Sequence, residues 1–143
     1  MIRKIECTDK EIYFKMSEQF YASGAALSAI GNDKREAFWP EILKDVFVHG
    51  YIFEHGGECA GYALTVPYAS QEFGGTVLWI DELFVLPNFR GLGIAKEFLR
   101  YAEKISCNVL LRLEVEKDNE RAVKIYRDGG FAVLPYIQMI KNT

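Results

Sequence analysis

A short loop with two glycines is the part of this sequence that points most directly to chemistry. The run Arg90-Gly91-Leu92-Gly93-Ile94-Ala95 follows a strand-like segment that stops at Pro87, and a helical pattern begins at once. Glycines let neighbouring backbone N–H groups turn toward one point without a Cβ in the way. The helix start adds unsatisfied N–H groups and the positive end of its dipole. Strand, glycine loop and helix start together predict a phosphate cradle, and hence a ligand that carries a diphosphate.

Composition excludes several classes of protein. The 143 residues are enough to bury one core, so we expect a single domain over residues 1–143. Half of the residues are hydrophobic, which excludes disorder, and the net charge of −3 argues against nucleic acid as the main partner. No apolar run approaches membrane-spanning length, and Arg3, Lys4 and Glu6 interrupt any signal peptide. We therefore expect a cytoplasmic protein with no membrane partner.

The three cysteines do not predict a metal site. Cys7, Cys59 and Cys107 lie far apart, with no CxxC motif and no nearby pair of histidines. A structural metal ion needs clustered ligands. We expect no metal cofactor, and three buried free thiols in a reducing compartment.

Hydrophobic periodicity predicts an antiparallel first half that also contains two helices. Strands are expected at 1–7, 50–55, 58–66 and 76–86, with helices that begin after Thr8 or Asp9 and at Asp33. Gly56-Gly57 is a strong hairpin signal between two of these strands. The polar residues 67–75 are expected to form a loop. Pro40 is expected to kink the second helix or to mark its first turn.

The second half has a strand–helix–strand pattern. The helix after the glycine loop ends near Ile105, and alternating apolar residues predict a strand over 108–116. Asp118 or Asn119 caps a last helix, which Gly129-Gly130 ends. Residues 131–141 are then expected to supply one or two closing strands, interrupted at Pro135.

The glycine loop also matches a family signature. Arg90 to Ala95 fits the pattern [QR]-x-x-G-x-[GA], between the strand and the helix that this signature requires. A second block matches as well, and it consists of Leu113-Glu114-Val115, Asn119, Ala122, Tyr126 and Gly130-Phe131. The sequence thus resembles the GNAT superfamily of N-acetyltransferases over nearly its whole length. The resemblance implies an α/β fold with a central, mostly antiparallel sheet of six to seven strands and about four flanking helices.

The resemblance implies direct transfer of acetyl from acetyl-coenzyme A to an amine. In such enzymes the pyrophosphate rests on the N–H groups of the glycine loop, here those of Leu92, Gly93, Ile94 and Ala95. Arg90 and Gly91 lie beside them and complete the cofactor-binding loop. The pantetheine arm pairs with the preceding strand at Phe84 and Val85, where a backbone N–H can polarise the thioester carbonyl. Asn119 either bonds this arm or simply caps the last helix.

The same resemblance suggests an acid and a base. An alkyl ammonium, with a pKa of about 10.4, must lose a proton before it attacks, and the leaving thiolate needs one. Tyr126, on the inward stripe of the last helix, matches the tyrosine that supplies that proton in many relatives. For the base we rank Glu82 first, then Asp81 and Glu114. Family members often have a bulge in the strand that carries Asp81 and Glu82, so strand alternation does not choose between them.

The sequence indicates less about the acetyl acceptor than about the acetyl donor. The acidic pair and the aromatic first half favour a primary amine on a small cationic molecule, similar to a polyamine or an aminoglycoside. The spacing from Glu114 to Tyr126 instead resembles enzymes that acetylate protein N-termini, and protein lysines are a related alternative. A coenzyme A-binding regulatory module without catalysis is the alternative from another class. Relatives often dimerise through their C-terminal strands, so a homodimer is an open expectation.

Overall fold

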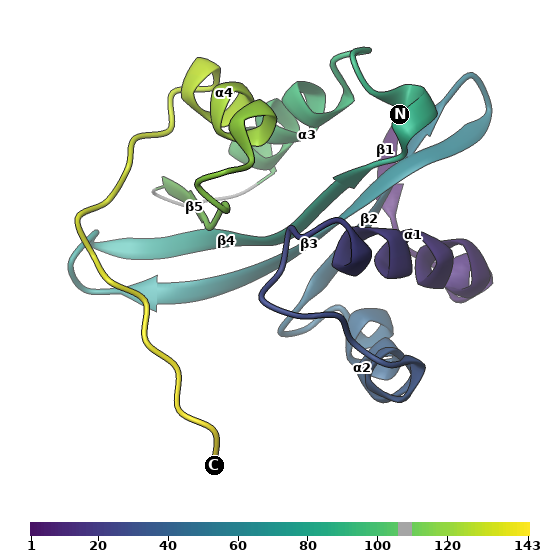
Figure 1. Ribbon diagram of the computed structural model, residues 1–143, viewed down its shortest axis with the longest axis horizontal. Coiled ribbons are helices and arrows are strands. Elements are labelled where there is room, and N and C mark those ends of the chain that lie inside the picture. Colours follow the sequence, from purple (N-terminus) through teal and green to yellow (C-terminus); the bar gives the residue numbers. More distant parts are fainter. Residues whose placement is uncertain (106–109) are drawn as a thin grey trace.

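A single sheet organises the chain, of which the computed structural model describes residues 1–105 and 110–143. Helices α1 and α2 lie on one face of the sheet, and α3 and α4 lie on the other (Figure 1). In chain order the elements are β1 (Ile2–Lys4), α1 (Lys10–Ala22), α2 (Asn32–Lys44), β2 (His49–His55), β3 (Glu58–Ser70), β4 (Gly75–Val85), α3 (Ile94–Lys104), β5 (Leu110–Leu113) and α4 (Glu120–Asp128).

The five strands lie in the order β1-β2-β3-β4-β5, and the first four are antiparallel. Strand β5 is parallel to β4 and pairs only with Val77 to Ile80. Past Ile80, strand β4 continues to Val85 with β3 on one side, while no strand of the described ranges pairs with its other side. Strands β4 and β5 therefore separate after Ile80, and the second half of β4 has one backbone edge that no described strand covers.

A bulge in β4 coincides with this parting. Glu82 is paired with Leu64 and Ile80 with Thr65, so Asp81 is an extra residue without a partner on β3. Because one extra residue reverses the alternation of side chains, Glu82 and Ile80 point to opposite faces of the sheet. Glu82 is buried on the face that α1 and α2 cover.

Each face of the sheet has its own hydrophobic core. Toward α1 and α2, alternate strand residues such as Tyr62 and Phe84 pack against Tyr13, Phe20 and Trp39. Toward α3, the intervening strand residues pack against the buried stripe of that helix, which consists of Ile94, Phe98, Leu99 and Ala102. The period of two along a strand and of about 3.6 along a helix gives each element the apolar side that its layer requires.

Several predicted boundaries were wrong in instructive ways. The expected loop over 67–75 is mostly strand: β3 runs to Ser70 and β4 begins at Gly75, because the two strands stay paired almost to the turn. Pro40 lies inside α2 and not in its first turn, and the helix begins at Asn32, one residue before the expected cap Asp33.

The closing strands were also wrong, and within the described residues the sheet has five strands in place of six or seven. Residues 131–141 contain no strand, although they form a largely apolar run. A strand needs a neighbour as well as a pattern, and this segment contacts the sheet edge through side chains, with the Tyr136 hydroxyl donating to Glu72 at 2.7 Å. The strand expected over 108–116 is confirmed at Leu110–Leu113, while Asn108 and Val109 lie outside the described residues.

Candidate functional site

The loop between β4 and α3 has the backbone that its glycines predict. Gly91 has φ of 86° and Gly93 has φ of 81°, a region that residues with a Cβ rarely adopt. A Cβ built on either glycine would meet no atom within 4 Å. The glycines are therefore needed for the turn of the chain, and the space beside the loop is open.

The backbone N–H groups of this loop remain free to bind a ligand. The first backbone hydrogen bond of α3 runs from Glu97 N–H to the Gly93 carbonyl at 2.9 Å. Within the described part of the chain, the N–H groups from Gly91 to Lys96 donate to no carbonyl. They lie at the positive end of the α3 dipole, which is the arrangement that binds phosphate at helix starts.

Arg90 connects this loop to the free edge of β4. Its Nε donates to the Val85 carbonyl at 3.0 Å, and its guanidinium carbon lies 5.8 Å from the centre of the Phe84 ring. Phe84 is buried and Val85 is half-buried. The side chain therefore fixes the loop next to the part of β4 that β5 does not cover.

Glu82 is the buried carboxylate at the parting of the strands. Only 6% of the residue is exposed. The Tyr21 hydroxyl donates to its Oε1 at 2.5 Å, and the Tyr62 hydroxyl donates to its Oε2 at 2.6 Å. Burial raises the pKa of Glu82 above its ordinary value, and the two tyrosine hydrogen bonds offset part of this rise. A carboxylate with a raised pKa is a stronger proton acceptor than an exposed one.

Asp81 occupies a different environment from its neighbour. It is exposed, and its Oδ1 accepts a hydrogen bond from Trp79 Nε1 at 3.2 Å. Neither the Tyr21 nor the Tyr62 hydroxyl donates to Asp81, since both donate to Glu82. The structure therefore brings Glu82 together with buried hydroxyl groups and leaves Asp81 toward solvent.

Tyr126 and Glu114 line a groove beside β5. The groove has a volume of about 1330 Å³, and the segment after α4 forms its opposite wall. Glu114 is exposed just past the end of β5. Tyr126 is half-buried, and its ring lies 5.7 Å from that of Phe131. Burial raises the pKa of Tyr126 to about 12, so its hydroxyl keeps its proton at neutral pH. Glu82 is not part of this lining.

Asn119 caps α4. Its side-chain oxygen accepts a hydrogen bond from the backbone N–H of Ala122 at 3.3 Å. This bond satisfies one of the free N–H groups at the helix start. The residue itself is exposed.

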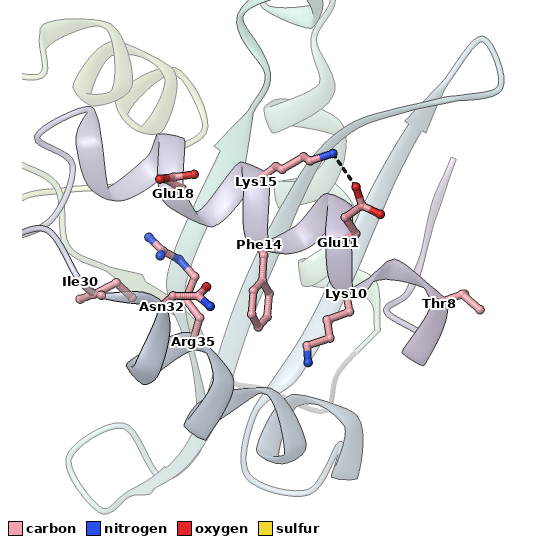
Figure 2. A pocket seen from close by; sticks show the side chains of 10 residues that line it. Thr8, Lys10, Glu11, Phe14, Lys15, Glu18, Ile30, Asn32 and Arg35 are labelled. Atoms are coloured by element: carbon pink, nitrogen blue, oxygen red, sulfur yellow. Dashed lines mark hydrogen bonds and ion pairs between the residues drawn. The ribbon is translucent and has the colours of Figure 1, made fainter.

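A second hollow, of about 700 Å³, lies between α1 and the start of α2 (Figure 2). Its lysines are already paired: Lys15 with Glu11 and Lys10 with Glu36, both at 2.7 Å. None of the residues predicted for the site lines this hollow.

Comparisons with known proteins decide the family. Residues 11–131 match the sequence model of the acetyltransferase (GNAT) family. The chain belongs to this family. It is also 26% identical, over 82% of its length and 69% of the relative's, to a thialysine N-epsilon-acetyltransferase of Bos taurus. This GNAT chain is therefore an N-acetyltransferase, and it uses acetyl-coenzyme A as the acetyl donor.

Solved structures confirm the predicted fold. AAC(6')-Iy in complex with a bisubstrate analogue, CoA-S-monomethyl-acetylneamine, aligns with a TM-score of 0.80 and 21% identity, over 100% of this chain and 97% of that one. The integron cassette protein HFX_CASS3, from the mobile metagenome of a Cole Harbour salt marsh, aligns with a TM-score of 0.81 and 21% identity, over 99% of this chain and 89% of that one.

Sequence reasoning about this acetyltransferase missed the two tyrosines that contact Glu82. Neither Tyr21 nor Tyr62 lies in a motif that would identify it from the sequence. Each is far from Glu82 in the sequence, by 61 and 20 residues. Only the register of β3 on β4 could have placed Tyr62 near Glu82, and the bulge made that register unpredictable.

Other features were tested within the described ranges. No three His, Cys, Asp or Glu side chains there lie close enough to share a metal ion. Cys7 is exposed and Cys59 half-buried, so the expectation of buried thiols was wrong for Cys7, which starts a surface turn. Cys107 lies outside the described residues. None of the described helices combines the length and the apolar character that a membrane span requires.

The raised pKa of Glu82 predicts a pH-dependent loss of stability. Between its ordinary value of 4.5 and its folded value, the folded protein holds a proton that the unfolded chain has released, so stability falls as pH rises through this window. The substitution Glu82→Gln removes this pH-dependent contribution to the free energy of unfolding. We expect the Tm of the wild type to fall more than that of the variant as the pH rises above 4.5. Thermal unfolding followed by circular dichroism measures both, with Asp81→Asn as the exposed control. Parallel curves for the wild type and Glu82→Gln would contradict the assignment.

Proposed function

We propose that this enzyme transfers acetyl directly to a primary amine of a small cationic molecule, similar to a polyamine or an aminoglycoside, with Glu82 as the general base. The main observation in support of the proposal is the buried carboxylate of Glu82, which lies just past the point where β5 stops pairing with β4. The bovine relative is named for thialysine, which is a small molecule with a primary amine. The likeness to aminoglycoside acetyltransferases supports the fold that such an acceptor site requires.

The residues present fit coenzyme A. Free N–H groups from Leu92 to Ala95 would hold its pyrophosphate, as they lie at a helix start and face open space. The uncovered edge of β4 at Phe84 and Val85 would hold the pantetheine arm as a neighbouring strand does. When bound, the donor supplies an acetyl thioester. A backbone N–H aimed at its carbonyl contributes about 3 kcal/mol of transition-state stabilisation.

Glu82 and Tyr126 divide the proton transfers. Glu82 accepts one proton of the acceptor ammonium, which frees the nitrogen lone pair to attack the thioester carbonyl. The nitrogen loses its second proton to solvent as the amide bond forms. Tyr126, whose hydroxyl stays protonated at neutral pH, donates to the sulfur as the carbon–sulfur bond breaks. The leaving thiol thus carries the tyrosine proton, and solvent exchange returns both groups to their starting states.

One observation favours a second candidate function. Glu114 and Tyr126 line the same groove, and that groove is wide and open. A protein N-terminus or an exposed lysine could enter it with Glu114 as base. The two functions differ in which carboxylate the reaction requires and in which acceptor it uses.

The choice of base and acceptor can be tested together. We expect Glu82→Gln to lower kcat/KM for small amines by about 10²–10³-fold, because the ammonium loses its proton acceptor. Thiol release from acetyl-coenzyme A would be followed with spermidine, thialysine, kanamycin and a lysine-containing peptide. Asp81→Asn is the matched control and should keep most of the activity. Turnover of the peptide alone, with loss of activity in Glu114→Gln and not in Glu82→Gln, would establish the second candidate.

The acid is tested by Tyr126→Phe. We expect kcat to fall at least tenfold, while the Kd for coenzyme A stays unchanged, because the hydroxyl acts on the leaving group. Tyr101→Phe, a half-buried tyrosine on α3, is the control. A wild-type kcat at saturating substrates would remove Tyr126 as the acid.

The cradle is tested by Gly93→Leu. The added side chain enters the open space beside the loop, and we expect the Kd for coenzyme A to rise at least tenfold as hydrogen bonds to phosphate are lost. Gly74→Leu is the matched control, since Gly74 has a similar φ of 72°, has equally open surroundings and lies in the β3–β4 turn. Isothermal titration calorimetry measures both. Equal affinities for the two variants would show that the loop does not hold the diphosphate.

A further inference from the structure

The Glu82 carboxylate is held on both sides by neutral hydroxyl groups. Tyr21, from the last turn of α1, donates to one oxygen at 2.5 Å, and Tyr62, from β3, donates to the other at 2.6 Å. These distances are typical of charge-assisted O–H to carboxylate bonds. The orientation of the carboxylate is therefore determined by two elements that are distant in the sequence.

The two tyrosines differ in their freedom to move. Tyr62 has no exposed surface, and its ring packs edge-on against Tyr13, with 5.1 Å between centroids. Phe20 and Phe84 enclose the same ring at 6.4 and 6.0 Å. Tyr21 is half-buried. The oxygen that accepts from Tyr62 is thus bonded to a fully buried side chain, while the other accepts from a side chain that reaches solvent.

The other titratable groups around the carboxylate do not form hydrogen bonds or ion pairs with it. Arg35 faces it from α2, and Asp81 and Tyr13 face it from β4 and α1. Arg35 is buried, but its Nε donates to Ser17 at 3.2 Å. A guanidinium directly on the carboxylate would stabilise its charged form and make it a weak base. Neutral tyrosines orient the group and leave it able to accept a proton.

We propose that Tyr62 is a positioning residue for the base: its hydroxyl fixes one oxygen of Glu82, so that the other oxygen, on the Tyr21 side, receives the proton of the acceptor. The inference rests on the proposed role of Glu82 for its effect on the reaction. Its structural part, that the Tyr62 hydroxyl stabilises the carboxylate of Glu82, holds independently of that role.

The test compares Tyr62→Phe with Tyr13→Phe. The first removes a donor from Glu82, and the second removes a hydroxyl from the same buried cluster that does not bond Glu82. We expect the carboxyl carbon of Glu82, followed by ¹³C NMR in glutamate-labelled protein and assigned with Glu82→Gln, to titrate about one pH unit higher in Tyr62→Phe only. The acid limb of the pH profile of kcat/KM with acetyl-coenzyme A and thialysine or spermidine, whichever is turned over, should move by the same amount. Activity should recover at high pH.

A second variant keeps both the ring and the hydroxyl of Tyr62, and it separates the effect of the hydrogen bond from an effect on folding. In place of Tyr62, 3-fluorotyrosine is a stronger donor of similar shape and should move the NMR titration of Glu82 to lower pH. An unchanged titration in both Tyr62 variants, or an equal shift in Tyr13→Phe, would overturn the proposal. A shifted NMR titration with an unmoved pH profile would instead show that the hydrogen bond acts on Glu82 but that Glu82 is not the base. That result overturns the catalytic part of the proposal and the proposed function together.

Discussion

Among the described strands, β4 has two neighbours up to Ile80 and one beyond it, and the rest of the site depends on this change. A strand that is paired on both sides offers no backbone groups to a ligand. Where β5 ends, β4 has an edge that no strand of the described ranges covers, along the segment that leads into the glycine loop and that Arg90 contacts at the Val85 carbonyl. The bulge at Asp81 falls at the same point and turns the next side chain, Glu82, to the face of α1 and α2. One interruption of the sheet thus exposes a backbone edge and redirects a carboxylate.

Two acids of this fold show how environment separates structural from chemical roles. Asp9 accepts two hydrogen bonds from the Arg3 guanidinium, at 2.7 and 2.8 Å, and this contact lowers the pKa of Asp9. The pair joins the first strand to the start of α1 and holds its charge across the working pH range. Glu82 is buried to a similar degree but has only neutral direct partners, so burial raises its pKa. A fixed charge serves as a structural tie, whereas a carboxylate that gains and loses a proton is suited to catalysis.

The sequence predicted the features that depend on local chemistry. Gly91 and Gly93 required positive φ, and Pro87 ended the strand, so the loop and the start of α3 were correctly placed. The choice between Asp81 and Glu82 could not be made, because the bulge is a property of two strands and not of one. Tyr62 was missed for the same reason. The closing strands after Gly130 were wrong because an apolar run shows that residues suit a strand but not whether a neighbouring strand is present.

The separation into two cores bears on how acceptor preference can change during evolution. The helices that cover Glu82, α1 and α2, pack into one core, while the helix that begins at the glycine loop packs into the other. The two cores share the sheet but have no buried side chain in common. Substitutions on the α1 and α2 side can therefore accumulate and reshape the surroundings of Glu82 without repacking the residues that support α3. A lineage can explore new amines while the conformation of the glycine loop is preserved.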